Sequence, residues 1–261
     1  MAHASRQRTN IQDRPGAAGS EQMPTSSLAD PARASSAPTA QPSRRARRDR
    51  GAETRAQLIE AALDVFGRLG FEGASTREIA RAANVNLAAI VYHFGGKEAL
   101  HLAVAEHVAA SILAKIGPTL ASVADPAASA SPEAARAALT QLLDTFVAVM
   151  LGSAEAERWA RFIVREQMQP TEAFDVIYGF MGGSHSLGTR LVATILDRDE
   201  DDADVQIRMF TMIGQIMVFR VAQAVVLRRM NWTAIGADQR ADIKRIVLAQ
   251  VGAILDAEAA R

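Results

Sequence analysis

One short segment, residues 75–97, constrains the fold more than any other part of the chain. It reads Ser-Thr-Arg-Glu-Ile-Ala-Arg-Ala-Ala-Asn-Val-Asn-Leu-Ala-Ala-Ile-Val-Tyr-His-Phe-Gly-Gly-Lys. Ser75 and Asn86 are good helix N-caps, because their side chains accept hydrogen bonds from free backbone N–H groups. The pattern predicts a helix over Thr76–Ala83, a tight turn at Asn84-Val85 and a second helix that begins at Asn86. This is the order of elements in a helix-turn-helix.

A small set of apolar side chains in this segment can lock the two short helices at a steep angle. They are Ile79, Ala80, Ala83, Val85 and Ile90. The front of the second helix is then exposed and carries small side chains, as a helix that enters the major groove of DNA requires. The segment therefore predicts DNA binding.

The residues around this segment resemble the TetR family of bacterial transcriptional regulators, over about residues 50–105. Arg55–Gly70 is similar to that family's first helix, and Phe71–Ala80 is similar to the approach to its second. His93–Leu100 is similar to the join into its fourth helix, and Asn86–Glu98 resembles the CecR-like branch of the family. The sequence departs from the family at one place. The aromatic side chain usual at the position of Val91 is here carried by Tyr92.

The resemblance implies an all-α fold with a three-helix, helix-turn-helix domain followed by a larger helical domain for dimerisation and effector binding. We expect a disordered basic tail over 1–49, the DNA-binding domain over 50–97 and the effector-binding and dimerisation domain over 98–261. The tail is rich in Ala, Ser, Arg, Pro and Gln and lacks apolar periodicity. A targeting peptide or a misassigned start codon is the alternative interpretation of that segment.

The resemblance also implies which residues contact DNA. Thr76 and Arg77 lie where the second helix meets the duplex, and Asn86, Leu87, Ala88 and Ala89 form the front of the recognition helix. Arg77 and Asn86 can bond base edges, and the apolar side chains suit a thymine methyl. Tyr92, His93 and Lys97 can each bond a phosphate oxygen.

Each of the last three residues also has a structural interpretation. His93 can cap or pack under the helix, Tyr92 can belong to the core, and Lys97 can be an ordinary solvated lysine. The run Arg44–Arg50 just before the first helix can contact phosphates as a flexible arm, or it can be a solubilising tail.

Charge is distributed unevenly although the whole chain has a formal net charge of zero. Residues 44–101 hold ten Lys or Arg against seven Asp or Glu, whereas residues 102–261 hold fifteen against nineteen. The positive part carries the helix-turn-helix, so the attraction to phosphate is local. The absence of cysteine excludes a disulfide scaffold and a cysteine-ligated zinc site.

Apolar periodicity predicts helices over the rest of the chain and no strand. The expected ranges are 96–116, ended by Gly117-Pro118, and then 132–151, 154–169, 171–196, 205–230 and 238–259. The longest apolar run, within Met209–Phe219, is far short of the ~20 residues that a membrane span needs, so we expect no membrane contact.

The helix predicted over 205–230 is apolar around most of its circumference. Together with the last helix it can supply half of a four-helix bundle, and a two-fold axis would supply the other half. A homodimer is also what an operator requires, because two recognition helices must fit successive major grooves. Burial of this helix wholly within its own subunit is the alternative.

An inducer pocket is expected in the C-terminal part, where Arg161 and Arg165 would line it with Tyr178 and His185 from the next helix. The competing interpretation is a salt-bridged face, in which Arg158, Arg161 and Arg165 pair with Glu155, Glu157 and Glu166.

No catalytic constellation, metal-ligand spacing or cofactor motif is present in the sequence, so no enzyme and no cofactor is expected. The sequence thus predicts a cytoplasmic homodimer that binds a pseudo-palindromic, double-stranded DNA operator and represses transcription until an unknown small-molecule inducer binds. A helical dimer whose head binds a protein partner instead of DNA is the main alternative. An enzyme that depends on His185 or Glu166 is a third.

Overall fold

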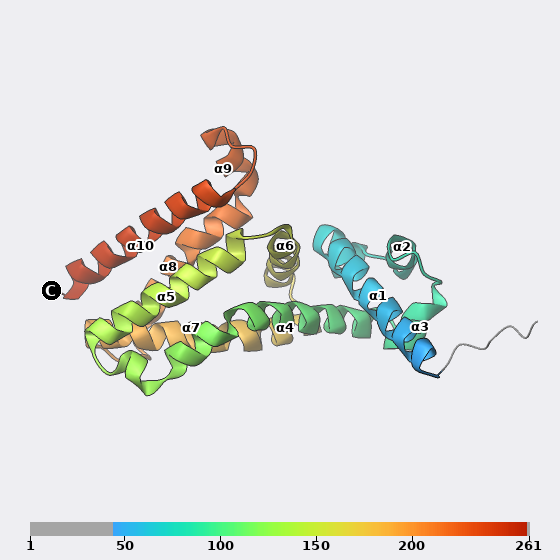
Figure 1. Cartoon of the computed structure of the whole chain (residues 1–261), viewed down its shortest axis with the longest axis horizontal. Coiled ribbons are helices and arrows are strands. Elements are labelled where there is room, and N and C mark those ends of the chain that lie inside the picture. The colour runs from blue at the N-terminus through green and yellow to red at the C-terminus, as the bar shows by residue number, and fades with distance from the viewer. Residues whose placement is uncertain (1–43, 260–261) are drawn as a thin grey trace, which may run out of the picture. The chain divides into compact units, whose positions relative to one another are not determined.

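The structure is a computed structural model that describes residues 44–259 of the 261-residue chain. Within this part the chain forms α-helices and one 3-10 helix and no strand, which confirms the all-α prediction (Figure 1). The predicted disorder of residues 1–43 lies outside the described residues.

The helices follow one another in the order expected, with several bounds that differ. They are α1 Arg44–Gly73, α2 Thr76–Ala82, α3 Ala88–Phe94, α4 Lys97–Ala124, η1 Pro126–Ser129, α5 Pro132–Leu151, α6 Ala154–Met168, α7 Glu172–Leu196, α8 Ala203–Val221, α9 Gln223–Met230 and α10 Ala237–Ala259. Helices α5, α6, α7 and α10 agree with the predicted ranges to within about a residue at each end. The turn of the helix-turn-helix is longer than expected, since α3 begins at Ala88 and not at Asn86.

Helix α1 begins at Arg44, so residues 44–49, which were expected to belong to a disordered tail, are helical. Its first residues are arginines and an alanine, which are strong helix formers, and neither proline nor glycine interrupts them before Gly51. Near its other end the helix kinks at Gly70, where φ is 74° and ψ is 174°. Only glycine adopts this conformation readily, and it turns the chain toward α2.

Helix α4 passes through Gly117-Pro118, where the sequence predicted its end, so that prediction was wrong. A proline inside a helix removes one backbone hydrogen bond, although its fixed φ is compatible with helix. The residues beyond it are apolar and buried: Val123 is fully buried, and Leu120 packs against both cores. Burial of these side chains outweighs the helix-breaking cost of the dipeptide, which is about 3 kcal/mol for a proline inside a helix.

The single helix predicted over 205–230 is two helices, α8 and α9, bent by 73° at Ala222. Alanine is a strong helix former, so the sequence carries no sign of this break. Helix α8 buries Val205, Met209, Met212 and Ile216, whereas α9 has no buried residue. The chain thus changes direction where its contact with the core ends.

Two apolar cores stabilise the described part of the chain. The first gathers side chains from α1 to α4 with α6 and α7, and its largest fully buried members are Phe66, Trp159 and Phe162. The second lies among α5, α7, α8 and α10, with the end of α4. The first core continues across residue 97, because α4 contributes Leu100 and Val104 near its start and Ile116 further along.

Helices α4 and α5 are long and apolar enough, by length and composition alone, to cross a membrane, and the bent pair α8–α9 passes the same test together. The expectation that no segment reaches this length was therefore wrong, because alanine-rich helices with few charges reach a mean hydropathy of 1.4. The apolar residues of α4 and α5 also form the two cores, and 44% of each window is buried inside the protein.

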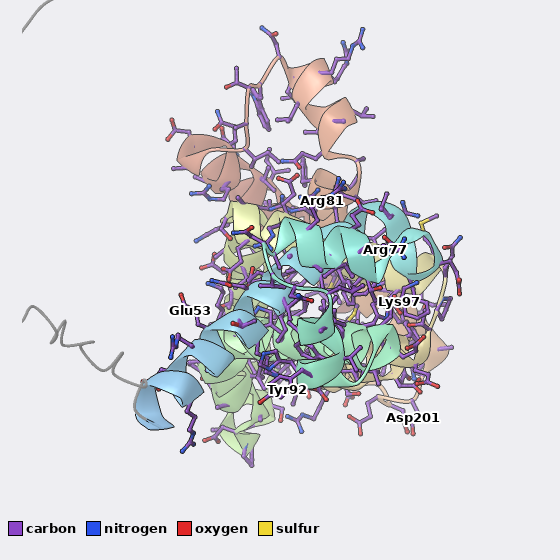
Figure 2. All side chains as sticks on the ribbon, turned by 90° about the vertical axis from the view of Figure 1, so that its right-hand side faces the viewer. Glu53, Arg77, Arg81, Tyr92, Lys97 and Asp201 are labelled. Atoms are coloured by element: carbon purple, nitrogen blue, oxygen red, sulfur yellow. The ribbon has the colours of Figure 1, made fainter. Side chains whose placement is uncertain are left out.

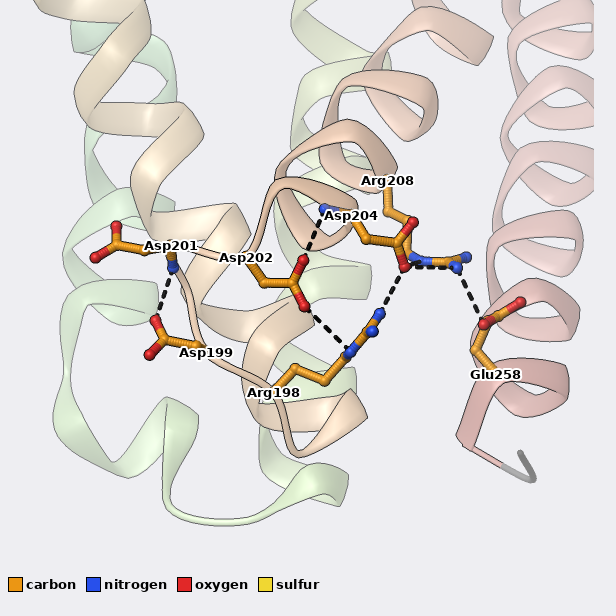
Figure 3. A network of polar contacts seen from close by, with 7 residues as sticks. All are labelled: Arg198, Asp199, Asp201, Asp202, Asp204, Arg208 and Glu258. Atoms are coloured by element: carbon orange, nitrogen blue, oxygen red, sulfur yellow. Dashed lines mark hydrogen bonds and ion pairs between the residues drawn. The ribbon is translucent and has the colours of Figure 1, made fainter.

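The acidic connector between α7 and α8 is held by an ion-pair network (Figure 3). Arg198 binds Asp202 and Asp204, and Arg208 binds Asp204 at 3.0 Å and Glu258 of α10 at 3.0 Å. The two arginines lower the pKa of the Asp204 carboxyl through hydrogen bonds. The network fixes the start of α8 against the end of α10.

Candidate nucleic-acid interface

The helix-turn-helix is built by local hydrogen bonds that the sequence specifies. The Ser75 hydroxyl accepts a bond of 3.1 Å from the Glu78 amide, and the Asn86 side-chain oxygen accepts one of 2.9 Å from the Ala88 amide. Asn84 takes a left-handed conformation with φ of 53° at the turn, and Gly95 does so at the end of α3 with φ of 85°. The predicted cap at Ser75 is therefore present, whereas the N-cap of α3 is Leu87 and Asn86 lies in the turn just before it.

Helix α2 presents arginines on one side and apolar residues on the other. Ile79 and Ala80 are buried against α1, Thr76 is half-buried, and Arg77 is exposed. Arg81, one turn after Arg77, is also exposed, and Figure 2 shows both on the end of the molecule formed by α2 and α3. Arg81 was not among the residues predicted to contact DNA, although its i, i+4 spacing from Arg77 was a usable signal.

Helix α3 exposes the residues expected at the front of a recognition helix. Asn86, Leu87 and Ala88 are exposed, whereas Ala89 is half-buried and packs against the first core. Ile90 is buried and holds the helix in place. Val91 is 64% exposed, so the residue at the family's aromatic position also reaches solvent.

Tyr92, His93 and Lys97, which could contact phosphate or have a structural role, differ in their surroundings at the far end of α3. Tyr92 is 85% exposed and does not belong to the core (Figure 2). His93 is half-buried, with its ring 4.9 Å from that of Tyr92. Lys97 is half-buried and its ammonium lies 4.3 Å from the centre of the Phe71 ring, so it is not an ordinary solvated lysine.

We call the exposed residues of these two helices, Arg77, Arg81, Asn86, Leu87, Ala88, Val91 and Tyr92, the α2–α3 surface. No hydrogen bond or ion pair to another described residue occupies the side chain of Arg77, Arg81 or Tyr92. Two guanidinium groups, an amide and a phenol are thus available on one face. This set can bond both base edges and phosphates.

Behind this surface, polar bonds join α1 to α6. Arg158 donates to Asp64 at 2.6 Å, to the Glu60 carboxylate at 2.7 Å and to the Glu60 carbonyl at 2.8 Å. Arg165 donates to the carbonyl of Arg68 at 2.8 Å. Burial opposes the charge of Arg158, but its hydrogen bonds to Asp64 and Glu60 raise its pKa overall. We call these five residues the α1–α6 joint, and they fix the helix-turn-helix to the rest of the protein.

A buried polar cluster lies beside the joint, formed by His101, Glu166 and Thr171 from α4, α6 and the start of α7. His101 Nε2 lies 3.3 Å from Glu166 Oε1, and the Thr171 hydroxyl donates to Glu166 Oε2 at 2.8 Å. Burial, with the charge of Lys97, lowers the pKa of His101 to about 4. His101 is therefore neutral at pH 7, and its contact with Glu166 is not an ion pair there.

The structure does not bring together the four residues expected at an inducer pocket. Arg161 and Arg165 line a groove of about 540 Å³ between α1, α6 and the α8–α9 bend. Tyr178 is 64% exposed on α7, and the His185 ring lies 4.0 Å from Phe210 of α8, so neither lines this groove. The two pairs are carried by α6 and α7 and point to different neighbours.

The alternative prediction, that the charged residues of α6 form salt bridges, is confirmed, but most of the partners differ from those expected. Only Arg161 pairs within the helix, with Glu157 at 3.9 Å. Glu155 pairs with Lys115, and Glu166 contacts His101. Arg158 and Arg165 are bound to α1 instead.

Two family models match the chain, one to each half. Bacterial regulatory proteins of the tetR family match residues 58–104, and the C-terminal domain of the HTH-type transcriptional dual regulator CecR matches residues 135–258. The chain is 34% identical over 210 residues to the HTH-type transcriptional dual regulator CecR of Shigella flexneri, which covers 79% of this chain and 93% of that protein. A shorter match, 41% identical over 58 residues, is to the HTH-type transcriptional repressor NicS of Pseudomonas putida.

Solved structures share the fold. A TetR-like transcriptional regulator from Rhodococcus has a TM-score of 0.53 at 20% identity, covering 77% of this chain and 96% of that one. AibR, solved in complex with isovaleryl coenzyme A and operator DNA, has a TM-score of 0.54 at 16% identity, covering 76% of this chain and 97% of that one.

A helix-turn-helix with an open recognition helix, joined to a larger helical body, defines a DNA-binding transcriptional regulator, which is not a class of enzymes. The chain belongs to the TetR family, and its C-terminal half is of the CecR type.

Proposed function

We propose that this regulator binds a pseudo-palindromic operator as a homodimer, with the α2–α3 surface of each subunit in a major groove. The observation that carries the proposal is the set of side chains on that surface with no bonding partner in the described protein. Arg77 and Asn86 would bond base edges, with Leu87, Ala88 and Ala89 against thymine methyl groups. The Asn86 side-chain oxygen accepts from the Ala88 amide, which leaves its NH₂ group for a base.

The remaining site residues would fix the register on the duplex. Thr76 and Arg81 flank the base-reading part of α2, and Tyr92, His93 and Lys97 lie at the end of α3 and the start of α4. Hydroxyl, imidazole and ammonium groups all bond phosphate oxygens without reading sequence. Each would therefore weaken binding to every sequence alike when it is removed. The DNA-binding domain would comprise 50–97, with α4 shared between it and the effector-binding and dimerisation domain over 98–261.

Dimerisation would use α8 and α10, which pack on one another. Each helix is only half covered by its own subunit: Met212 and Ile216 are buried, whereas Phe210 is 63% exposed and Ile207 59%. On α10, Ile246 and Ile254 are exposed in the same way. Apolar stripes of this size on two neighbouring helices support a four-helix bundle across a two-fold axis.

A small molecule would switch this dimer between two states. Because the joint fixes α6 to α1, a movement of α6 would carry the recognition helix with it and change the distance between the two half-sites. A ligand must favour the non-binding state ~10⁴-fold, or ~5.5 kcal/mol, to move occupancy decisively. The effector site would include Arg161 and Arg165 in the groove, without Tyr178 and His185. Repression in the cytoplasm, with no role for a membrane, is the simplest form of this function, since the apolar residues of α4 and α5 form cores.

The experiment is selection of bound fragments from genomic DNA with the purified full chain, followed by affinity measurements at several salt concentrations. If each subunit contacts about 3–4 phosphates, log K against log[salt] should have a slope of about −5 to −7. A flat slope, a strictly monomeric protein, or equal affinity for all sequences would contradict the proposal. A flat slope with a protein captured at the same surface would favour a protein partner.

A further inference from the structure

Arg220 is the most buried arginine in the described part of the chain, and no carboxylate binds it. It lies in the last turn of α8 and is 9% exposed. Its Nε donates at 2.8 Å to the carbonyl of Met150 in α5, and its Nη2 donates to the same oxygen. No Asp or Glu oxygen of the described residues lies within 4.0 Å of the guanidinium. Buried charges in proteins are normally paired, so this cation lacks its usual counter-ion.

The charged groups near Arg220 do not neutralise its positive charge. Burial lowers the pKa of the Arg220 guanidinium, and the nearest carboxylate that acts on it, Glu157, only partly opposes this. Glu157 is itself 3.9 Å from Arg161. Arginine cannot lose its proton in a protein, so Arg220 stays charged. The arrangement therefore favours an anion from outside the chain.

Arg220 lines the groove that Arg161 and Arg165 also line, and the groove has the size of a ligand site. Its volume is about 540 Å³, within the range of about 300–1,000 Å³ that small-molecule sites occupy. Three arginines face one glutamate along its walls, so its charge is positive. The rest of the lining is mostly apolar, with two glutamines: Ala160, Val164, Met168, Val221 and Ala224, with Gln169 and Gln223.

We propose that this groove binds a small organic anion with an apolar body, whose carboxylate or equivalent group pairs with Arg220 while the body lies on α6 and α9. This rests on the proposed function, in which a ligand controls DNA binding, and it names the chemical class of that ligand. An apolar lining with one or two fixed charges is what recognises an amphipathic anion.

The groove also reaches α1, the first helix of the DNA-binding domain, which gives the ligand a route to the helix-turn-helix. Gly67 of α1 lines it, and a Cβ at that position would meet Arg161 Cβ at 3.5 Å. Arg165 lines the groove and at the same time donates to the carbonyl of Arg68. An anion that draws Arg165 toward itself weakens that bond, so ligand binding and the position of α1 are coupled.

The test uses the full chain and straight-chain carboxylates from acetate to decanoate, each compared with its uncharged primary amide by calorimetry. We expect the best carboxylate to bind at least about ten-fold more tightly than its amide, because only the charged form pairs with Arg220. Arg220→Met should reduce this affinity by about ten-fold or more, and Arg161→Gln by about three-fold. Ala224→Phe, at an exposed position of the groove, should block binding without disturbing the core.

Arg136→Gln is the matched control, since Arg136 forms an exposed ion pair with Asp256 outside the groove, and it should bind like the wild type. The inference is overturned if no carboxylate binds more tightly than its amide, or if Ala224→Phe and Arg161→Gln bind like the control. These two variants keep the test decisive should Arg220→Met fail to fold. Operator affinity without the anion is measured for every variant. Normal operator binding without carboxylate binding would contradict this inference alone. Absence of operator binding would contradict the proposed function.

Discussion

Arginine side chains have opposite roles in the α2–α3 surface and in the α1–α6 joint. Arg77 and Arg81 are exposed and have no bonding partner among residues 44–259, whereas Arg158 and Arg165 make their bonds to α1. A guanidinium held by the protein fixes the angle between two helices. One without a partner costs the protein little stability and is available to a phosphate or a base.

The comparison separates two kinds of mutational effect. Changes on the α2–α3 surface should alter DNA affinity and leave the free energy of unfolding unchanged, because no packing is lost there. Changes at the joint and in the cluster beside it should alter stability first, and DNA affinity only through the position of α1. Four measurements test this separation.

The largest effect is expected for Arg77→Ala. Loss of one base contact costs about 1–3 kcal/mol, and a dimer loses two, so operator affinity should fall by about 2–6 kcal/mol. Discrimination should relax at one base position in each half-site, and the melting temperature should not change. Lys97→Ala serves as the contrast, since it should weaken all sequences alike. An equal loss on every sequence for both variants would break the assignment of Arg77 to a base.

His101 should make stability fall as the solution becomes acidic. Folding lowers the pKa of His101 from 6.5 to about 4. Between these two pH values His101 is therefore protonated in the unfolded chain and neutral in the folded protein. The stability that depends on a neutral His101 is fully present above pH 6.5, and it is lost as the pH falls from 6.5 to about 4. At 1.36 kcal/mol per unit the loss amounts to at most about 3.4 kcal/mol.

Urea unfolding from pH 7.5 to 4, compared between the wild type and His101→Gln, measures this contribution. The variant removes the titrating group, so its stability should decline less steeply over this window. Parallel curves for the two proteins would show that folding does not lower the pKa of His101, and a less steep decline for the wild type would show that His101 is charged and paired with Glu166 in the folded state.

Arg158→Ala should destabilise the protein by about 2 kcal/mol, because hydrogen bonds to charged groups contribute about 1.5–3 kcal/mol and this site is partly exposed. Arg161→Ala is the matched control on the same helix. Its ion pair is long and exposed, and the substitution should cost no more than about 0.5 kcal/mol. Equal melting temperatures for the two variants would remove the distinction between the joint and an ordinary salt-bridged face.

Tyr92→Phe should have the smallest effect. It removes one hydroxyl that bonds phosphate, so the affinity for all DNA sequences should fall by about 1 kcal/mol per subunit. Since Tyr92 is 85% exposed, thermal stability should stay the same. A clear loss of stability would mean that the phenol is held by the protein after all.

Local chemistry in the sequence was enough to predict much of this molecule. The cap at Ser75 forms where its side chain indicated, and the Asn86 side chain bonds the Ala88 amide nearby, since such bonds depend only on residues two or three positions away. The periodicity over 132–151 predicted α5 correctly for the same reason. The exposure of Arg77 agrees with the apolar residues that face the other way on α2, whereas the sequence left open whether Tyr92 is exposed or belongs to the core.

Predictions that depended on distant contacts did worse. The supposed stop at Pro118 is overridden by the burial of Val123, and the break at Ala222 comes where α8 leaves the core. The sequence placed Arg161 and Arg165 with Tyr178 and His185, but α6 and α7 present these pairs to different neighbours. It did not single out Arg220, although a charge at the end of an apolar run was a visible signal.

By itself the amino-acid sequence determined the helical class, the helix-turn-helix and the family, because these depend on spacing and capping within one or two turns. Only the tertiary structure decided which arginines are bound to α1, which one is buried without a carboxylate, and which remain available to DNA. The physical reason is that the role of a guanidinium depends on the distance to its nearest acceptor. In this protein the donor and the acceptor can lie far apart in the chain, as Arg158 and Glu60 do at a separation of 98 positions.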